Sequence, residues 1–289
     1  MWALRKYGKV GPRAFRMLLI RFGGLAGIHQ AGLADLMKID GLDDDRCEKI
    51  AEGSDFLEEA EAFISSLEPE NIECRTFLDD DYPVLLRELN DPPPLIFYRG
   101  GLPGPDEKTV AIVGSSRAGN EGIGTGVNLA SEMASRSISI VSGLTRGVSA
   151  AAHLGALKSK HRTYAVLDSG LAGIAPEENR LLASEIARHG GLISEYAPRE
   201  KADDKKFPER NRLVAALARA VVIGEVFPDS EVTLDMATFC QQLGKIMFIL
   251  IDNCDIDRGN REAVEKIMAL GAIPVDSRKN VNIIADSLV

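Results

Sequence analysis

Six short apolar runs follow one another between residues 110 and 251, and a segment with helical periodicity separates each run from the next. The apolar residues within a run are nearly continuous, as in Ala-Val-Val-Ile at 220–223. Such runs are typical of parallel strands that helices cover on both faces. We therefore expect an α/β domain with a doubly wound, mostly parallel sheet and right-handed crossovers. The expected strands are 110–114, 138–142, 163–167, 191–195, 220–225 and 246–251, and the expected helices are 120–136, 147–158, 177–189, 209–218, 231–243 and 259–270.

Two of the expected strands run directly into a glycine turn that carries an arginine. The first turn, residues 114–117, is Gly-Ser-Ser-Arg, and the second, residues 142–147, is Ser-Gly-Leu-Thr-Arg-Gly. A strand, a glycine turn and a helix start together present backbone N–H groups that favour an anion, and arginine makes phosphate the expected anion. The first turn is neither a dinucleotide fingerprint nor a Walker A loop. The candidate phosphate contacts are Ser115, Ser116, Arg117, Ser142, Gly143 and Arg146.

The densest basic segment of the chain lies between residues 201 and 212, and it contains one aromatic residue, Phe207. A ring for base stacking among cations for the backbone is how single-stranded nucleic acid is held without sequence readout. The alternative is an exposed charged loop before a helix, with Phe207 as a hydrophobic staple. The candidate contacts in this segment are Lys205, Lys206, Phe207, Arg210, Asn211 and Arg212.

Three further polar residues lie outside the two turns and the basic segment. Asn179 could bind either a neighbouring loop or a ligand, and the sequence does not separate the two. We expect His153 to serve packing, because no nucleophile or carboxylate partner is evident for it. Glu225, at the end of the fifth expected strand, is the one carboxylate to test for catalysis.

The composition limits the classes of protein to consider. A chain of 289 residues is long enough for one large domain and one small domain. The formal net charge of −9 argues against a generic nucleic-acid binder but leaves room for a local basic groove. The four cysteines are scattered, so we expect reduced thiols in a cytoplasmic protein. We expect no signal peptide, and no stretch approaches the ~20 apolar residues of a membrane span.

The region before the α/β pattern divides into two parts. Residues 11–67 show short helical patterns broken by glycine, which indicates a small bundle similar to helix-hairpin-helix arrangements. This bundle could be a packing or interaction domain, or it could contact DNA through a glycine hairpin, although acidic residues dominate it. Residues 76–105 are rich in proline and read as a linker, with 95–98 as a short strand at a sheet edge.

With these elements in order, the chain resembles the DNA-processing protein A family (DprA, also called Smf). The most specific match is Phe-Pro-Glu-Arg-Asn-Arg at 207–212. The matching segments, which follow the family's order over nearly the whole chain, are 82–83, 91–93, 95–100, 113–117, 142–147, 151–153, 176–180, 194–196, 207–212 and 271–272.

The resemblance implies a helical, sterile-alpha-motif-like domain at 1–75, a linker and edge strand at 76–105, and an extended Rossmann-like DNA-binding domain at 106–289. No C-terminal winged-helix domain is expected. It implies a cytoplasmic protein that is not an enzyme, uses no cofactor or metal, does not bind membranes, and forms a homodimer. Such a protein binds single-stranded DNA and loads RecA recombinase onto it during natural transformation.

The resemblance also assigns roles to the candidate residues. Arg117 and Arg146 would hold phosphates, with turn donors beside them at Ser115, Ser142 and Gly143. Lys205 or Lys206 would contact the DNA backbone, and Phe207 would meet a base. The residues that shape or line the pocket would be Asn179, Arg210, Asn211 and Arg212.

The chain departs from the family pattern at several positions near the expected site, namely Thr145, Ser149, Ala175 and Glu231. These departures keep two alternatives open. One is a nucleotide-binding protein of the same superfamily, either a sensor or a degenerate phosphoribohydrolase, although the hydrolases' Pro-Gly-Gly-x-Gly-Thr loop is missing. The other is a partner-binding protein with a degenerate pocket.

Overall fold

The computed structural model describes residues 1–52, 56–203, 205–227, 231–251, 261–279 and 281–288, with the backbone alone at 56–57 and 231–232. The chain forms two compact units. The first contains residues 1–82 and 87–96, and the second contains residues 83–86 and 97–289. None of the described helices combines the length and the apolar character that crossing a bilayer requires.

Short helices make up most of the first unit. Helix α2 begins with Pro12 in its first turn and ends at Gly23, which has φ of 71°. Asp43 caps α5 by accepting a hydrogen bond from the Arg46 N–H. Their apolar faces bury Phe15, Leu18 and other residues in one small core. The elements are α1 (Trp2–Lys6), α2 (Pro12–Phe22), α3 (Leu25–His29), α4 (Leu33–Leu36), α5 (Asp44–Ala51), α6 (Phe56–Ser65), η2 (Glu68–Glu70) and β1 (Glu73–Thr76).

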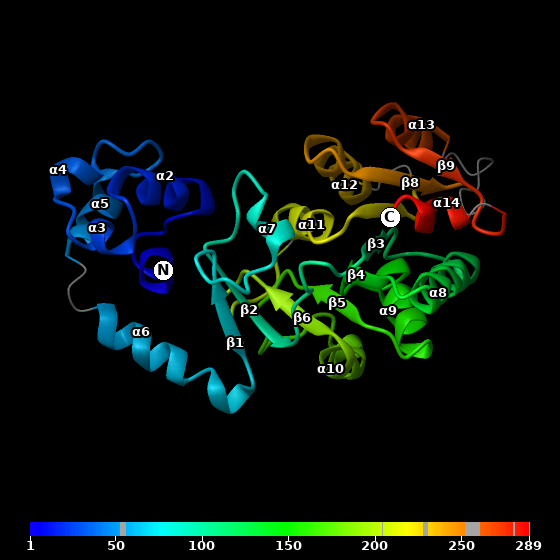
Figure 1. Cartoon of the computed structure of the whole chain (residues 1–289), viewed down its shortest axis with the longest axis horizontal. Coiled ribbons are helices and arrows are strands. Elements are labelled where there is room, and N and C mark those ends of the chain that lie inside the picture. The colour runs from blue at the N-terminus through cyan, green and yellow to red at the C-terminus, as the bar shows by residue number, and fades with distance from the viewer. Residues whose placement is uncertain (53–55, 204, 228–230, 252–260, 280, 289) are drawn as a thin grey trace. The chain divides into compact units, whose positions relative to one another are not determined.

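Within the described residues, the sheet has nine strands in the order β1-β2-β6-β5-β4-β3-β7-β8-β9 (Figure 1). β2 pairs antiparallel with β6, and the pairs from β6 through to β9 are parallel. This confirms the α/β fold with a mostly parallel sheet. The remaining strands are β2 (Leu95–Gly100), β3 (Thr109–Val113), β4 (Ser139–Gly143), β5 (Thr163–Val166), β6 (Gly191–Ser194), β7 (Ala220–Ile223), β8 (Ile246–Leu250) and β9 (Ile273–Val275).

Helices cover both faces of this sheet, as the continuous apolar runs predict. α8, α9 and α10 lie on one side, and α11 and α12 lie on the other (Figure 1). Alternate residues of each strand therefore enter different cores: Val110 and Ile112 of β3 join the cluster that contains Leu129 and Met133 of α8. The helices are α7 (Val84–Arg87), α8 (Asn120–Ser135), α9 (Val148–Lys158), η3 (Glu177–Asn179), α10 (Arg180–His189), α11 (Lys206–Ala216), α12 (Glu231–Gln242), α13 (Arg261–Ala269) and α14 (Val281–Asp286).

The structure corrects the prediction that residues 95–98 form an edge strand. β2 lies between β1 and β6, and all four residues of 95–98 are buried. The sequence did not indicate β1, because Glu-Cys-Arg-Thr lacks an apolar pattern. β9 and α14 were also not predicted, because β9 has only three residues and its middle one is Pro274. The predicted start of the last helix, at 259, lies outside the described residues.

The strand order places a switch point at β3. The chain runs from β3 to β4 on one side and later returns to β7 on the other side of β3. In open α/β sheets, ligands bind beyond the carboxyl ends of the strands at such a point. Both glycine turns lie at these carboxyl ends, because they follow β3 and β4.

Candidate nucleic-acid interface

The two glycine turns are in direct contact with each other. β3 and β4 are neighbouring parallel strands, so the turns begin side by side. The N–H of Val148, at the start of α9, donates to the carbonyl oxygen of Ser115 at 3.2 Å. Gly147 permits this approach, because it has φ of 71° and a Cβ there would lie 2.2 Å from the Ser115 oxygen.

The arginine of the first turn is exposed, and the backbone of the turn is hydrogen-bonded to Glu225. The Ser115 N–H donates to the Glu225 carbonyl at 2.9 Å, and the Ser115 hydroxyl accepts from the Arg117 N–H at 3.0 Å. Ser116 and Arg117 are exposed, and the Arg117 guanidinium lies 5.3 Å from the centre of the Phe227 ring.

The Glu225 carboxylate accepts from the Gly119 N–H at 3.1 Å, at the start of α8. A bound phosphate would otherwise be favoured at this helix start. The Glu225 carboxylate therefore occupies the position that a bound anion would take, and this hydrogen bond gives the side chain a structural role.

The second turn carries an arginine that is exposed but ion-paired. Two nitrogens of Arg146 donate to the two carboxylate oxygens of Glu178, at 2.5 and 2.6 Å. This hydrogen-bonded carboxylate raises the pKa of Arg146 above its ordinary value. Glu178 thus holds the guanidinium in the two-bond geometry that a phosphate would use.

Asn179 and Ser142 bind the protein itself rather than facing outward. The Asn179 amide donates to the Leu144 carbonyl at 2.9 Å, so of the two roles open for Asn179 the structure shows the loop contact. The Ser142 hydroxyl donates to the Ile112 carbonyl at 2.6 Å inside the sheet. Both side chains are buried, and they support the second turn from within.

His153 is completely buried beneath the second turn. Its Nε2–H donates to the Gly143 carbonyl at 2.8 Å, and its Nδ1 accepts from the Thr163 hydroxyl at 2.7 Å. Burial lowers the pKa of His153 from 6.5 to about 4, so the imidazole is neutral at physiological pH. This environment agrees with the expected packing role.

Arg210 of α11 brings the basic segment against the second turn. A Cβ at residue 143 would lie 1.5 Å from an Arg210 terminal nitrogen, so only glycine leaves room for the guanidinium there. Arg210 is 3% exposed, and burial lowers the pKa of its guanidinium while the charge of Asp168 opposes that shift. Its Cζ lies 5.4 Å from the centre of the Phe207 ring.

The other basic residues of this segment fall into exposed and buried groups. Lys205 is exposed, whereas Lys206 is partly buried, pairs with Glu200 at 2.8 Å and lies over the Tyr196 ring at 4.6 Å. Arg212 is buried and pairs with the buried Glu195 at 2.6 Å. Asn211 is also buried, and its side-chain N–H group makes no hydrogen bond within the described part of the chain.

The predicted site residues therefore divide by exposure. Those that reach the surface at least in part are Ser116, Arg117, Arg146, Lys205, Lys206 and Phe207. Those that are buried and support them are Ser115, Ser142, Gly143, Asn179, Arg210, Asn211 and Arg212.

The sequence did not indicate that carboxylates pair with these cations. The three partners are Glu178 for Arg146, Glu200 for Lys206 and Glu195 for Arg212. The side chain of Glu231 lies outside the described residues. Among the residues that the structure describes, no group of acidic, histidine or cysteine side chains is arranged to hold a metal ion.

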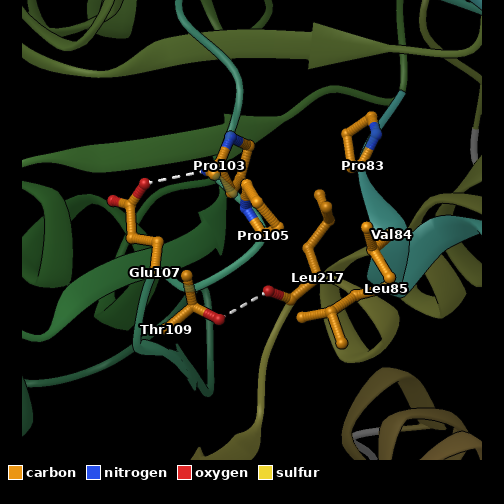
Figure 2. A pocket seen from close by; sticks show the side chains of 9 residues that line it. Pro83, Val84, Leu85, Pro103, Pro105, Glu107, Thr109 and Leu217 are labelled. Carbon is orange, nitrogen blue, oxygen red and sulfur yellow. Dashed lines mark hydrogen bonds between the residues drawn. The ribbon is translucent and has the colours of Figure 1, made fainter. Parts of the chain in front are cut away.

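A small pocket lies at the amino ends of the strands, opposite the glycine turns (Figure 2). Pro83, Pro105, Thr109 and Leu217 line it, and Thr109 is the first residue of β3. The Thr109 hydroxyl is bonded to the Leu217 carbonyl at 2.7 Å. The pocket is mostly apolar and lies at the amino end of β3, whereas the glycine turns lie at the carboxyl ends of the strands. It is therefore not part of this interface.

Comparison with known proteins places the chain among its relatives. The model of the family described as DNA recombination-mediator protein A matches residues 73–285. The chain belongs to this family. Protein Smf of Synechocystis sp. is 31% identical over 92% of the chain and 71% of that protein. DNA processing protein DprA of Streptococcus pneumoniae is 37% identical over 52% of the chain, which spans about half of that relative's length.

Two solved structures of the family agree with the fold. The X-ray structure of DprA from S. pneumoniae superposes with a TM-score of 0.82 and 26% identity, and covers 99% of this chain and 96% of that one. The structure of DprA from Helicobacter pylori superposes with a TM-score of 0.63 and 26% identity, over 75% of this chain and 97% of that one. That work describes a single-stranded DNA binding mode of the H. pylori protein.

Proposed function

We propose that this chain binds single-stranded DNA at the carboxyl edge of its sheet and passes it to RecA recombinase. The observation that carries the proposal is continuity: Ser115 contacts the start of α9, and Gly143 contacts Arg210 of α11. Two arginine turns and a basic helix start thus share one surface. Membership of the family and the H. pylori relative's described binding mode support the same ligand.

The chemistry of this surface suits a single strand without sequence readout. Arg117 and Arg146 would form charge-assisted hydrogen bonds with phosphates, and Lys205 and Lys206 would neutralise the backbone nearby. Phe207 would stack on a base, which any nucleobase permits. No reacting group is needed for this role, so the protein acts as a binding protein and not as an enzyme.

The negative body of the protein shapes how it would bind. With a net charge of −9, the surface beyond this edge repels nucleic acid. Glu178 and Glu200 already pair with Arg146 and Lys206, so DNA phosphates must displace these carboxylates. Binding would therefore be confined to the described edge and would weaken steeply as salt rises. A cytoplasmic homodimer is the form we propose for the working protein.

Two experiments test the proposal in sequence. A gel-shift titration with single-stranded and double-stranded oligonucleotides should show preference for the single strand, and absence of any shift would reject DNA binding. RecA filament assembly on oligonucleotide coated with single-stranded-DNA-binding protein should then be faster with the chain present. An unchanged assembly rate would reject the loading step while leaving DNA binding intact.

The nucleotide-binding alternative is distinguished by a thermal shift assay. The position of the turns at a switch point is shared with nucleotide-binding α/β proteins, and this observation keeps the alternative in view. Glu225, which follows β7, opposes this alternative, because its carboxylate accepts from the Gly119 N–H that a nucleotide phosphate would use. Stabilisation by a mononucleotide, with none by an oligonucleotide, would favour the alternative.

A further inference from the structure

Arg210 is a buried cation without a bonded carboxylate partner among the described residues. It is 3% exposed, and it forms no ion pair with any residue that the structure describes. Its Nε makes no hydrogen bond to any described residue. Burying a guanidinium without a bonded carboxylate is costly, so this position is maintained against a considerable penalty.

The guanidinium is held between two components of the proposed interface. On one side is the backbone of Gly143, where a Cβ would lie 1.5 Å from an Arg210 nitrogen. On the other is the ring of Phe207, whose centre is 5.4 Å from Arg210 Cζ. Phe207 and Arg210 are three residues apart in α11, the spacing at which helical side chains meet. The cation–π contact is favourable because this guanidinium is desolvated.

From this geometry we propose that Arg210 is a positioning residue that holds the Phe207 ring ready to stack on a DNA base, without touching DNA itself. The inference rests on the proposed function, in which Phe207 meets a base. Because Phe207 is the second residue of α11 and only partly buried, its ring needs a support on the protein side. A ring that is fixed before binding loses less entropy when a base stacks on it.

The test compares two oligomers of equal length, oligothymidylate and a chain of abasic sites, by fluorescence anisotropy. The ratio of the two affinities isolates the contribution of the bases, since both oligomers carry the same phosphates. We expect Phe207→Ala and Arg210→Lys each to lower the affinity for oligothymidylate about tenfold. The affinity for the abasic oligomer should stay within about twofold of the wild-type value. The double variant should be no weaker than Phe207→Ala, because the two residues act as one unit.

Arg219→Lys is the control, since Arg219 precedes β7 and donates to the Glu107 and Pro105 carbonyls, outside the proposed interface. We expect it to keep the wild-type ratio. If Arg210→Lys weakens both oligomers equally, or if its effect adds to that of Phe207→Ala, the positioning role is wrong. If Arg210→Lys does not fold, Gly143→Ala, which displaces the guanidinium, is judged by the same ratio. A wild-type protein that binds neither oligomer would reject the proposed function itself.

Discussion

Arg146 and Glu178 form a two-bond ion pair at the surface, with nitrogen–oxygen distances of 2.5 and 2.6 Å. Arg146 lies in the second glycine turn and Glu178 in η3, which begins after Pro176. The carboxylate occupies the same two donors that a phosphate would use. The pair therefore acts as a competitor within the molecule for any anion that approaches this turn.

We predict that Glu178→Gln strengthens binding to a single-stranded oligonucleotide. A neutral amide cannot match a carboxylate as partner for Arg146, so the guanidinium becomes available to phosphate. The expected gain is about twofold to fivefold, the range that an exposed ion pair carries. Glu185→Gln removes a comparable exposed pair, with Arg188 on α10, and should have no effect. Equal or weaker binding by Glu178→Gln would show that Arg146 does not meet phosphate.

Arg117→Ala should weaken the same interaction and reduce its dependence on salt. Each phosphate neutralised on a single strand contributes about −0.7 to the slope of log K against log salt concentration. We therefore expect the slope to become less negative by about that amount when Arg117 is lost. Anisotropy titrations at several salt concentrations measure it, with Arg188→Ala as the control. A slope that stays the same would place Arg117 outside the contact.

The stability of the protein should depend on pH through His153. Its pKa falls from 6.5 when unfolded to about 4 when folded, so the unfolded state binds more protons between these values. The free energy of unfolding therefore rises with pH across this window and is fully recovered above pH 6.5. Protonation of His153 below this window lowers the free energy of unfolding by about 3 kcal/mol.

His153→Gln provides the comparison, because the glutamine amide can still donate to the Gly143 carbonyl but does not titrate. Urea denaturation across the acidic range should show a smaller loss of unfolding free energy for the variant than for the wild type. Parallel losses would mean that His153 is not the buried neutral group that the structure shows.

Asn179→Ala should destabilise the protein without changing its charge. The variant leaves the buried Leu144 carbonyl without its amide donor, a change that costs about 1–3 kcal/mol. Asn128→Ala, an exposed position of α8, is the control and should be nearly neutral. Denaturant unfolding compares the two variants. An Asn179→Ala protein as stable as the control would contradict a stabilising hydrogen bond from Asn179 to the Leu144 carbonyl.

Much of the fold could be predicted because its signal is local. β3 and β7 are largely apolar runs that are buried on both faces, and the position of the turns that follow β3 and β4 comes from the parallel strand order. β1 escaped prediction because Glu73 to Thr76 forms a strand through backbone pairing, without an apolar pattern. The start of α11 was placed at 209 instead of Lys206, because Pro208 suggests a boundary although proline is tolerated in a first turn.

The candidate site was less predictable, because its organisation depends on contacts between distant residues. Arg146 and Glu178 are 32 positions apart, and nothing local to either residue indicates their pairing. Arg210 looked like one more cation of an exposed segment, yet tertiary packing against Gly143 buries it. The sequence named the candidate residues, and the structure separates those that are exposed from those that are buried.

Exposed cations at the carboxyl ends of the strands are proposed to hold the phosphates of a single strand. The most direct test is the affinity of the wild-type protein for a single-stranded oligonucleotide, measured across a range of salt, with a nucleoside monophosphate as competitor. Four contacts, from Arg117, Arg146, Lys205 and Lys206, predict a slope of log K against log salt of about −2 to −3 and no competition by the monophosphate. A slope near zero, or displacement of the oligonucleotide by the monophosphate, would contradict it.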